Sequence, residues 1–121
     1  MAQRLGDREA GVMDVLWDGD EPLTVRDVLE RLAVRSLAYT TVMTVLDNLH
    51  RKGFVAREKA GRAYRYRAAL SRSEHTASLM NEALDSSHDR SAALLHFVES
   101  ISPTELAELR AIVGDLEGDQ R

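Results

Sequence analysis

Apolar side chains recur at helical spacing in three segments of the first half of the chain. Residues 7–17, 24–33 and 39–52 each gather apolar side chains on one face of a helix, with repeats of three and four residues. In the first segment, Met13 and Trp17 lie on that face. The pattern predicts three short amphipathic helices, each with a polar face left for water or for a partner.

Residues at the ends of these segments have the character of helix caps. Asp7 is a candidate N-cap of the first helix, and Thr24 is followed three residues later by Asp27, as in a capping box. Residues 23–25, just before the second helix, form a candidate short strand. Gly53 stands where a glycine in the left-handed conformation commonly ends a helix, so the third helix is expected to cover 39–52.

Two strands and a tight turn follow the third helix. Residues 54–59 and 62–68 have the composition of strands, Gly61 supplies the turn, and in the second strand tyrosines alternate with arginines. Three helices followed by a hairpin are typical of a winged helix-turn-helix, whose third helix enters the major groove of DNA. The chain is therefore predicted to be mainly α, in the α+β class, with a winged helix-turn-helix and two-stranded wing over residues 1–70.

From Ser71 onward the pattern is acidic and helical. Capping-box patterns begin at Ser71 and Ser102, a break falls at residues 86–89, and Gly118 is expected to end the last helix. Residues 71–121 are too few to bury all their apolar side chains within one chain, so we predict that they form a helical dimerisation region with a twofold interface. The residues expected in that interface are Leu94, Phe97, Val98, Ile101, Leu106, Leu109, Val113 and Leu116.

Charge is unevenly distributed over the 121 residues. The net charge is −4, but residues 35–67 hold eight basic side chains against two acidic ones, whereas residues 71–121 hold four against ten. A basic patch is the electrostatic footprint of a nucleic-acid-binding surface, and it also occurs on ordinary solvated faces. Charge alone therefore leaves both interpretations open.

Cysteine is absent, and no apolar stretch approaches the roughly 20 residues that cross a membrane. Without cysteine there are no disulfides and no thiolate metal sites, which fits a reducing compartment. The first residues include acids and lack the apolar core of a signal peptide. We expect a cytoplasmic protein with no membrane insertion, no metal site and no cofactor.

The third helix and the hairpin together offer two kinds of contact to double-stranded DNA. Threonine hydroxyls and methyls can contact base edges, Asn48 can bind adenine, and basic side chains suit phosphates. Asp47 lies on the same helix face, and its charge would repel phosphate. The residues expected to contact DNA are Thr40, Thr41, Met43, Thr44, Asn48, Arg51, Lys52, Arg62 and Arg65.

A family resemblance is carried by residues 13–17, by residues 24–28, by residues 37–46 with 49–53, and by residues 61–62 with 64–66. They are similar to the first two helices, the recognition helix and the wing of the BlaI/MecI penicillinase-repressor family. The similarity covers about residues 4–117, and it is specific through residues 1–70 and looser afterwards. The sequence departs from the family at Ala38, where some members have a serine cap.

The resemblance implies a homodimeric transcriptional repressor, not an enzyme, with C-terminal dimerisation helices. It implies a palindromic operator of TACA/TGTA half-sites and target genes for β-lactamase, cell-wall or related functions. It also implies induction by a membrane sensor-protease system that cuts the dimerisation region at an Asn-Phe bond. The aligned bond here joins His96 and Phe97, so His96 departs from the family pattern.

Three other function classes remain to be weighed. An enzyme would need a catalytic or phosphate-binding motif, and none of the common ones accompanies the four histidines. A metal-responsive repressor would draw ligands from His75 with Glu74 or His88 with Asp89, although adjacent helical residues point in different directions. A winged-helix protein-interaction module would bury the polar face of the third helix against a protein, and salt-dependent DNA binding separates it from a repressor.

Overall fold

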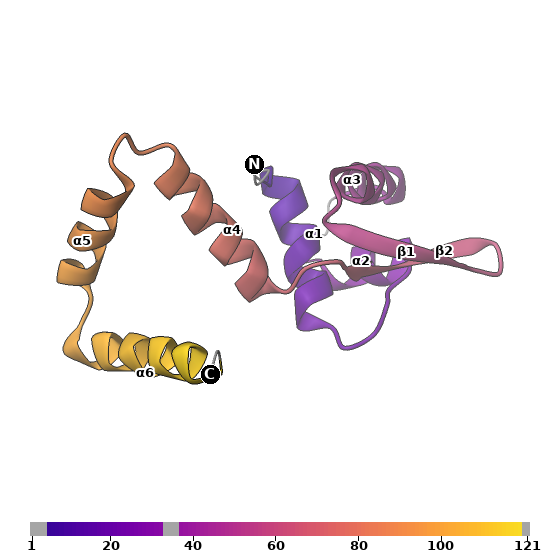
Figure 1. Ribbon diagram of the computed structural model, residues 1–121. Helices are drawn as coiled ribbons and strands as arrows, with labels where there is room; N and C mark the ends of the chain where they lie inside the picture. The colour runs from indigo at the N-terminus through magenta and orange to yellow at the C-terminus, as the bar shows by residue number, and fades with distance from the viewer. Residues whose placement is uncertain (1–4, 33–36, 120–121) are drawn as a thin grey trace. The chain divides into compact units, whose positions relative to one another are not determined.

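Three helices and an antiparallel hairpin form the first part of the chain, and three further helices follow (Figure 1). The structure is a computed structural model that describes residues 5–32 and 37–119. It confirms the predicted mainly helical α+β class. The elements in chain order are α1 (Asp7–Asp18), α2 (Val25–Arg31), α3 (Tyr39–Lys52), β1 (Val55–Ala60), β2 (Ala63–Ala68), α4 (Arg72–Asp85), α5 (Arg90–Ser100) and α6 (Pro103–Asp119).

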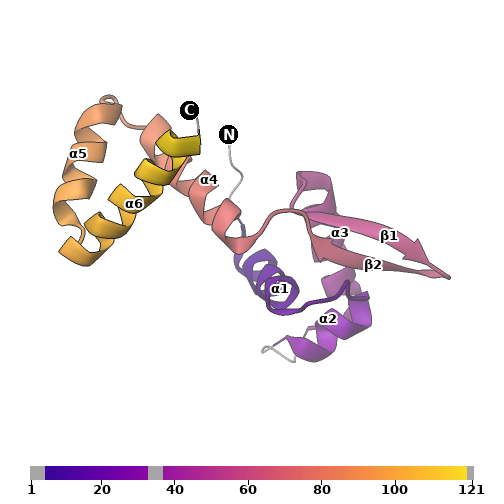
Figure 2. The same ribbon diagram turned by 60° about the horizontal axis from the view of Figure 1, so that its bottom comes forward.

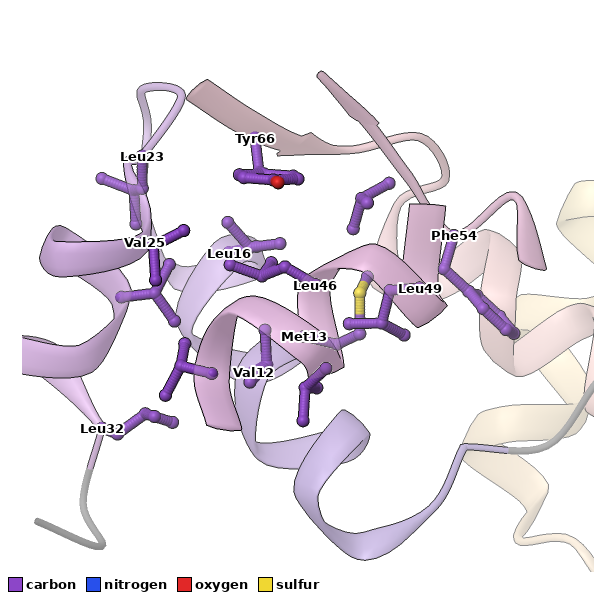
Figure 3. Packing of buried hydrophobic residues seen from close by; sticks show 14 residues of the cluster. Val12, Met13, Leu16, Leu23, Val25, Leu32, Leu46, Leu49, Phe54 and Tyr66 are labelled. Carbon is purple, nitrogen blue, oxygen red and sulfur yellow. The ribbon is translucent and has the colours of Figure 1, made fainter. Parts of the chain in front are cut away.

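The core of the first part is built from the apolar faces of α1, α2 and α3. Val42, Leu46 and Leu49 on α3 are fully buried, as are Val12 and Met13 on α1, and Figure 3 shows these helices packed around shared leucines and valines. Burying one such side chain is worth about 1.5–3 kcal/mol. The spacing of apolar residues predicted these faces, and the packing confirms them.

The hairpin is joined to this core by Tyr66, whose side chain is 2% exposed. In Figure 3 its ring extends from the hairpin toward Leu16 and Leu46. The Tyr66 N–H donates to the Leu23 carbonyl at 2.8 Å, and the Leu23 N–H donates to the Tyr66 carbonyl at 2.9 Å. The strand predicted over residues 23–25 is therefore wrong in extent: it is one bridge, because Thr24 already caps α2.

Several predicted helix ends are confirmed by hydrogen bonds. The Thr24 hydroxyl accepts the Asp27 N–H at 3.1 Å, and the Asp27 carboxylate accepts the Thr24 N–H at 3.1 Å. Gly53 ends α3 with φ of 86°, in the left-handed region where glycine has no Cβ penalty. Capping boxes also form at Ser71 and Ser102.

Two predicted ends are wrong. Asp7 is the first residue of α1 and Gly6 is its N-cap, because the Glu9 carboxylate turns back to accept the Gly6 N–H at 2.9 Å. Gly118 does not end α6, which continues to Asp119; within the described residues only Gly53 and Gly61 have positive φ, so Gly118 keeps helical geometry.

The remaining boundaries shift by one or two residues. α2 ends at Arg31 and not at residue 33, because Leu32 is its extended C-cap. Phe54 precedes β1 and is buried in the core. Residues 33–36, before α3, lie outside the described residues.

The first turns of α4 pack on the helices that precede them. His75 is buried, with its ring centroid 5.5 Å from the centroids of both Trp17 and Phe54. Arg72 lies over the Trp17 ring at 5.3 Å and pairs with Asp14 and Asp18. These contacts extend the first compact packing unit beyond the hairpin.

The chain divides into two compact units, Met1–Leu79 and Met80–Arg121, and α4 continues from the first into the second. In Figures 1 and 2 the tip of the hairpin extends beyond α1, α2 and α3 within the first unit. The assignment of DNA binding to residues 1–70 and of dimerisation to residues 71–121 stays a prediction, because packing alone does not assign a function to either part.

The cap of α2 gives a stability prediction. Thr24→Ala removes the hydroxyl that accepts the Asp27 N–H and should lower the free energy of unfolding by about 1 kcal/mol. Urea unfolding followed by circular dichroism measures this loss. Thr40→Ala, at an exposed position in the first turn of α3, is the matched control, and an equal loss there would contradict the capping role.

The same cap has a pH dependence. The Thr24 N–H hydrogen bond, with a further contribution from the Thr24 hydroxyl, lowers the pKa of Asp27. Because the pKa of Asp27 is lower in the folded state than in the unfolded state, ionised Asp27 stabilises the fold at pH values above the unfolded pKa. This stabilisation is lost as the pH falls through the folded pKa. The stability of Asp27→Asn should therefore fall less than that of the natural chain over this acid range.

Candidate nucleic-acid interface

The face of α3 opposite its buried stripe is open to solvent. Tyr39, Thr40, Met43 and Thr44 are exposed, and Thr41 is half-buried. This face results from the helical repeat, since the buried residues occupy the other side. The structure thus brings together the predicted contact residues of the first two turns of α3.

Thr44 has a constrained hydroxyl. Its Oγ1 donates to the Thr40 carbonyl at 3.0 Å, within the helix. The hydroxyl proton is therefore engaged, while the oxygen lone pairs and the methyl remain available. Such a side chain can accept a hydrogen bond from a base amino group or touch a thymine methyl.

The α3 N-terminus lacks a side-chain cap among the described residues. Ala38 occupies the N-cap position, and its carbonyl accepts the N–H groups of Thr41 and Val42. The open helix end is a place where backbone N–H groups can receive an anion.

The C-terminal turns of α3 hold polar side chains that are already partnered. Arg51 donates to the Asn48 side chain. Lys52 Nζ lies 2.9 Å from both carboxylate oxygens of Glu9 on α1. Burial opposes ionisation of Glu9, but the hydrogen bonds from Lys52 and Gly6 outweigh it and lower the pKa of Glu9. Of the two α3 cations predicted to contact phosphate, Arg51 and Lys52, Lys52 is therefore partly neutralised by Glu9.

The two faces of the wing differ in what they approach. β1 and β2 pair in an antiparallel register that places Arg57 opposite Tyr66 and Glu58 opposite Arg65. Because side chains alternate along a strand, Arg57, Tyr64 and Tyr66 share the face toward the core. Arg65 lies on the other face, beside Glu58.

A hollow of about 460 Å³ lies between α2, α3 and the wing. Arg62, predicted from the sequence to contact DNA, lines it together with Met43 and Tyr64. Arg65, the other predicted wing residue, does not. The structure therefore gathers Met43 and Arg62 at one surface and separates Arg65 from it.

Three residues at this surface, Arg26, Tyr39 and Arg57, were not among the contact residues predicted from the sequence. Arg26 lies 5.7 Å from the centroid of the Tyr39 ring, and both line the hollow. Arg57 pairs with Asp47 at 3.0 Å, so the acidic residue that would repel phosphate has a cationic partner. The alternation of the hairpin placed Tyr64 and Tyr66 on one face, and counting back across the turn could have added Arg57.

The second unit exposes much of the predicted dimerisation stripe. Leu94, Phe97, Val113 and Leu116 are between 45% and 59% exposed, and Val98, Ile101, Leu106 and Leu109 are half-buried. Leu95 and Ile112, which were not predicted, are 59% and 56% exposed. His96 is exposed near the middle of α5.

Groups of potential metal ligands and helices of membrane-spanning character were both sought in the described residues. No group of three or more His, Cys, Asp or Glu side chains is placed to hold a metal ion in residues 5–32 and 37–119. Over those same ranges, no helix combines the length and apolar character needed to span a bilayer.

Comparison with known proteins places these features in a family. The family model for the penicillinase repressor matches residues 5–115. Transcriptional regulator BlaI of Mycobacterium tuberculosis, in strains CDC 1551 / Oshkosh and ATCC 25618 / H37Rv, is 48% identical over 118 residues. That match covers 94% of this chain and 86% of the relative.

Solved structures support the fold. The DNA binding domain of the repressor BlaI is 27% identical with a TM-score of 0.53, covering 61% of this chain and 90% of that one. The Bacillus licheniformis BlaI monomeric form in complex with the blaP half-operator is 25% identical with a TM-score of 0.50 and the same coverage. Staphylococcus aureus MepR, 15% identical with a TM-score of 0.51 over 97% of this chain and 81% of that one, shows the fold alone.

The site separates base contacts from phosphate contacts in a testable way. Thr44→Ala should reduce discrimination between an operator and random DNA by about 1 kcal/mol, because it removes the base-edge contact that is predicted for Thr44. Arg62→Ala should weaken binding to both DNAs and reduce the salt slope by about one, as expected for a phosphate contact. Fluorescence anisotropy with both duplexes measures these effects.

Arg65→Ala is the matched control for the wing. Because Arg65 lies on the face away from the hollow, its loss should change binding less than the loss of Arg62. Equal effects of the two substitutions would contradict the assignment of the inner wing face to DNA. An equal loss of affinity for both DNAs in Thr44→Ala would make Thr44 a positioning residue.

Proposed function

This chain belongs to the penicillinase repressor family, and on that basis we propose that it acts as a homodimer on a palindromic operator in double-stranded DNA. Its relatives are transcriptional regulators and not enzymes, and its winged-helix fold is that of a DNA-binding repressor.

The main support is the shared surface of α3 and the wing. Met43 on α3 and Arg62 on the wing line one hollow, and the exposed Thr40 and Thr44 lie next to Met43 on the same helix face, so α3 and the wing can offer base-edge and phosphate contacts from one side of the molecule. The related Bacillus licheniformis protein binds the blaP half-operator in its monomeric form. By analogy, one winged helix of this chain binds a half-site, and a full palindrome takes two.

A DNA-binding titration tests this function. The full chain should bind a duplex with two TACA/TGTA half-sites more tightly than a shuffled duplex, and affinity should fall steeply between about 50 and 200 mM salt. Binding that is absent, or equal for both duplexes at all salt concentrations, would reject operator recognition. It would favour a protein-interaction module in the same fold.

Dimerisation is supported by the apolar side chains of α5 and α6. Leu94, Phe97 and Leu116 remain largely exposed in a single copy. Leu106, Leu109 and Val113 line an apolar hollow of about 290 Å³ on α6. Exposed apolar surface of this kind typically marks an interaction site, and a second copy of the same helices would cover it with twofold symmetry.

Leu109→Asp should produce monomers and weaken operator binding, because a charge among the apolar side chains of the proposed dimer interface would lose its hydration on association. Sedimentation velocity at micromolar concentration and anisotropy with the full operator measure the two effects. Glu108→Gln, at the neighbouring exposed position, is the control and should leave both unchanged. A natural chain that sediments as a monomer would reject the proposed dimer.

The proposed target genes encode β-lactamase, cell-wall or related functions. The repressor is proposed to act on them in the cytoplasm. The match to the penicillinase repressor family supports this choice, because a penicillinase is a β-lactamase and a repressor of its gene would control resistance to penicillin. Sequencing of DNA cross-linked to the repressor identifies the regulated genes directly.

Induction by cleavage is the finest part of the proposal. A membrane sensor-protease system would cut the bond between His96 and Phe97, separating the two winged helices. Each would then keep only single-site affinity, since the linked second site is lost. His96 and Phe97 are exposed within α5, which has no buried residue, but a helical bond must open locally before a protease can cut it.

Mass spectrometry of the repressor from induced cells tests the cleavage site. The expected products end at His96 and begin at Phe97, with release from DNA following their appearance. Derepression with intact chains only, or with ends elsewhere, would reject this site. Phe97→Ala tests whether the side chain is needed for cleavage, and Leu95→Ala, an exposed neighbour, controls for a general change in α5.

A further inference from the structure

Three side chains connect the exposed face of α3 to the wing. Arg57 Nη1 on β1 donates to Asp47 Oδ1 on α3 at 3.0 Å, and the Arg57 guanidinium carbon lies 4.3 Å from the centroid of the Tyr64 ring on β2. The Tyr64 ring is in turn 6.4 Å from the ring of Tyr66, which is buried in the core. A continuous series of contacts therefore leads from the core to α3; we call Asp47, Arg57 and Tyr64 the wing clamp.

The clamp contains the only acidic residue of α3. The Asp47 side chain is 50% exposed and that of Arg57 is 26% exposed, so solvent reaches both charges. Asp47 lines the hollow together with Met43 and Arg62. An unpartnered carboxylate there would repel the phosphates of DNA. Paired with Arg57, it adds almost no net charge to this surface.

The geometry of the clamp suits arginine in particular. A planar guanidinium can lie against an aromatic ring while its edge donates to a carboxylate, whereas a lysine ammonium is a single point charge. A hydrogen bond with Tyr66 and the nearby oxygens of Tyr64 and Asp47 raise the pKa of Arg57. Arg57 is therefore a permanent cation whose direction is set by three neighbours.

We propose that the Asp47–Arg57 pair determines specificity at the surface of α3 and the wing: Arg57 neutralises the Asp47 carboxylate, and Asp47 holds the Arg57 charge toward the protein. By keeping the Arg57 charge turned toward the protein, Asp47 lowers the affinity for DNA of any sequence and leaves discrimination to the threonine face of α3. This inference rests on the proposed function, because it requires α3 and the wing to contact DNA.

A double-mutant cycle in the full chain tests the clamp. Asp47→Asn, Arg57→Gln and the double variant are each titrated with an operator duplex and a shuffled duplex across the same salt range. Glu58→Gln is the matched control, since Glu58 is an acid of the same wing on the opposite face. Binding of the natural chain to the operator over the shuffled duplex tests the proposed function separately.

Asp47→Asn should bind the shuffled duplex several-fold more tightly and steepen its salt slope by about one, because Arg57 becomes free to contact a phosphate. The preference for the operator should fall accordingly. Arg57→Gln should bind both duplexes several-fold more weakly, because the Asp47 carboxylate is left uncompensated. The double variant should recover most of that loss, and Glu58→Gln should leave the operator preference unchanged.

Two results would overturn the inference. A double variant as weak as Arg57→Gln would mean that Arg57 itself contacts phosphate. An Asp47→Asn variant with unchanged affinity and salt slope on shuffled DNA would remove the specificity role. Thermal melting checks that each variant folds, and where Arg57→Gln does not, the Asp47→Asn titration decides the question alone. Failure of the natural chain to prefer the operator would reject the proposed function and not the clamp contacts, which the Arg57 and Tyr64 signals in NMR spectra of the free protein report.

Discussion

Burial of Tyr66 is the constraint on which the geometry of the DNA-facing surface depends. A two-stranded hairpin is marginally stable alone in water, and this one gains its anchor from an aromatic ring placed among the leucines of α1 and α3. The backbone of Tyr66 is also paired on both sides with Leu23, so the turn between α1 and α2 holds the same residue. Because Tyr66 fixes the position of the hairpin, the residues shortly before it in the chain, Arg62 and Tyr64, lie at the hollow beside α3.

The electrostatics of the surface are set as much by internal pairing as by composition. Residues 35–67 have a clear excess of basic side chains, yet Lys52 is held by Glu9 and Arg57 by Asp47. Pairing of exposed charges contributes little to stability, typically 0–1 kcal/mol. Its larger effect here is on which cations remain free to meet DNA, and that choice leaves Arg62 as a wing cation at the hollow.

Local pattern predicted the elements well, since helical repeats, a cap at Thr24 and a glycine at Gly53 are all written in short stretches of chain. It failed where the deciding contact was elsewhere. The hydrogen bond from the Gly6 N–H to the Glu9 carboxylate makes Gly6, and not Asp7, the N-cap of α1. Gly118 does not have a positive φ, and α6 continues through it. In the site, the exposed face of α3 followed from its periodicity, but the partners of Lys52 and Asp47 are distant in sequence, and no spacing rule identifies them.

The packing of His75 between Trp17 and Phe54 has a practical consequence. Trp17 is the only tryptophan of the chain, its indole N–H donates to the Leu70 carbonyl at 2.9 Å, and Arg72 lies over its ring. The chromophore therefore lies where α4 departs from the winged helix, and both the His75 ring and the Arg72 guanidinium beside it belong to α4. Its emission is an intrinsic optical probe of that junction, able to follow detachment of α4 in the natural chain without an added label.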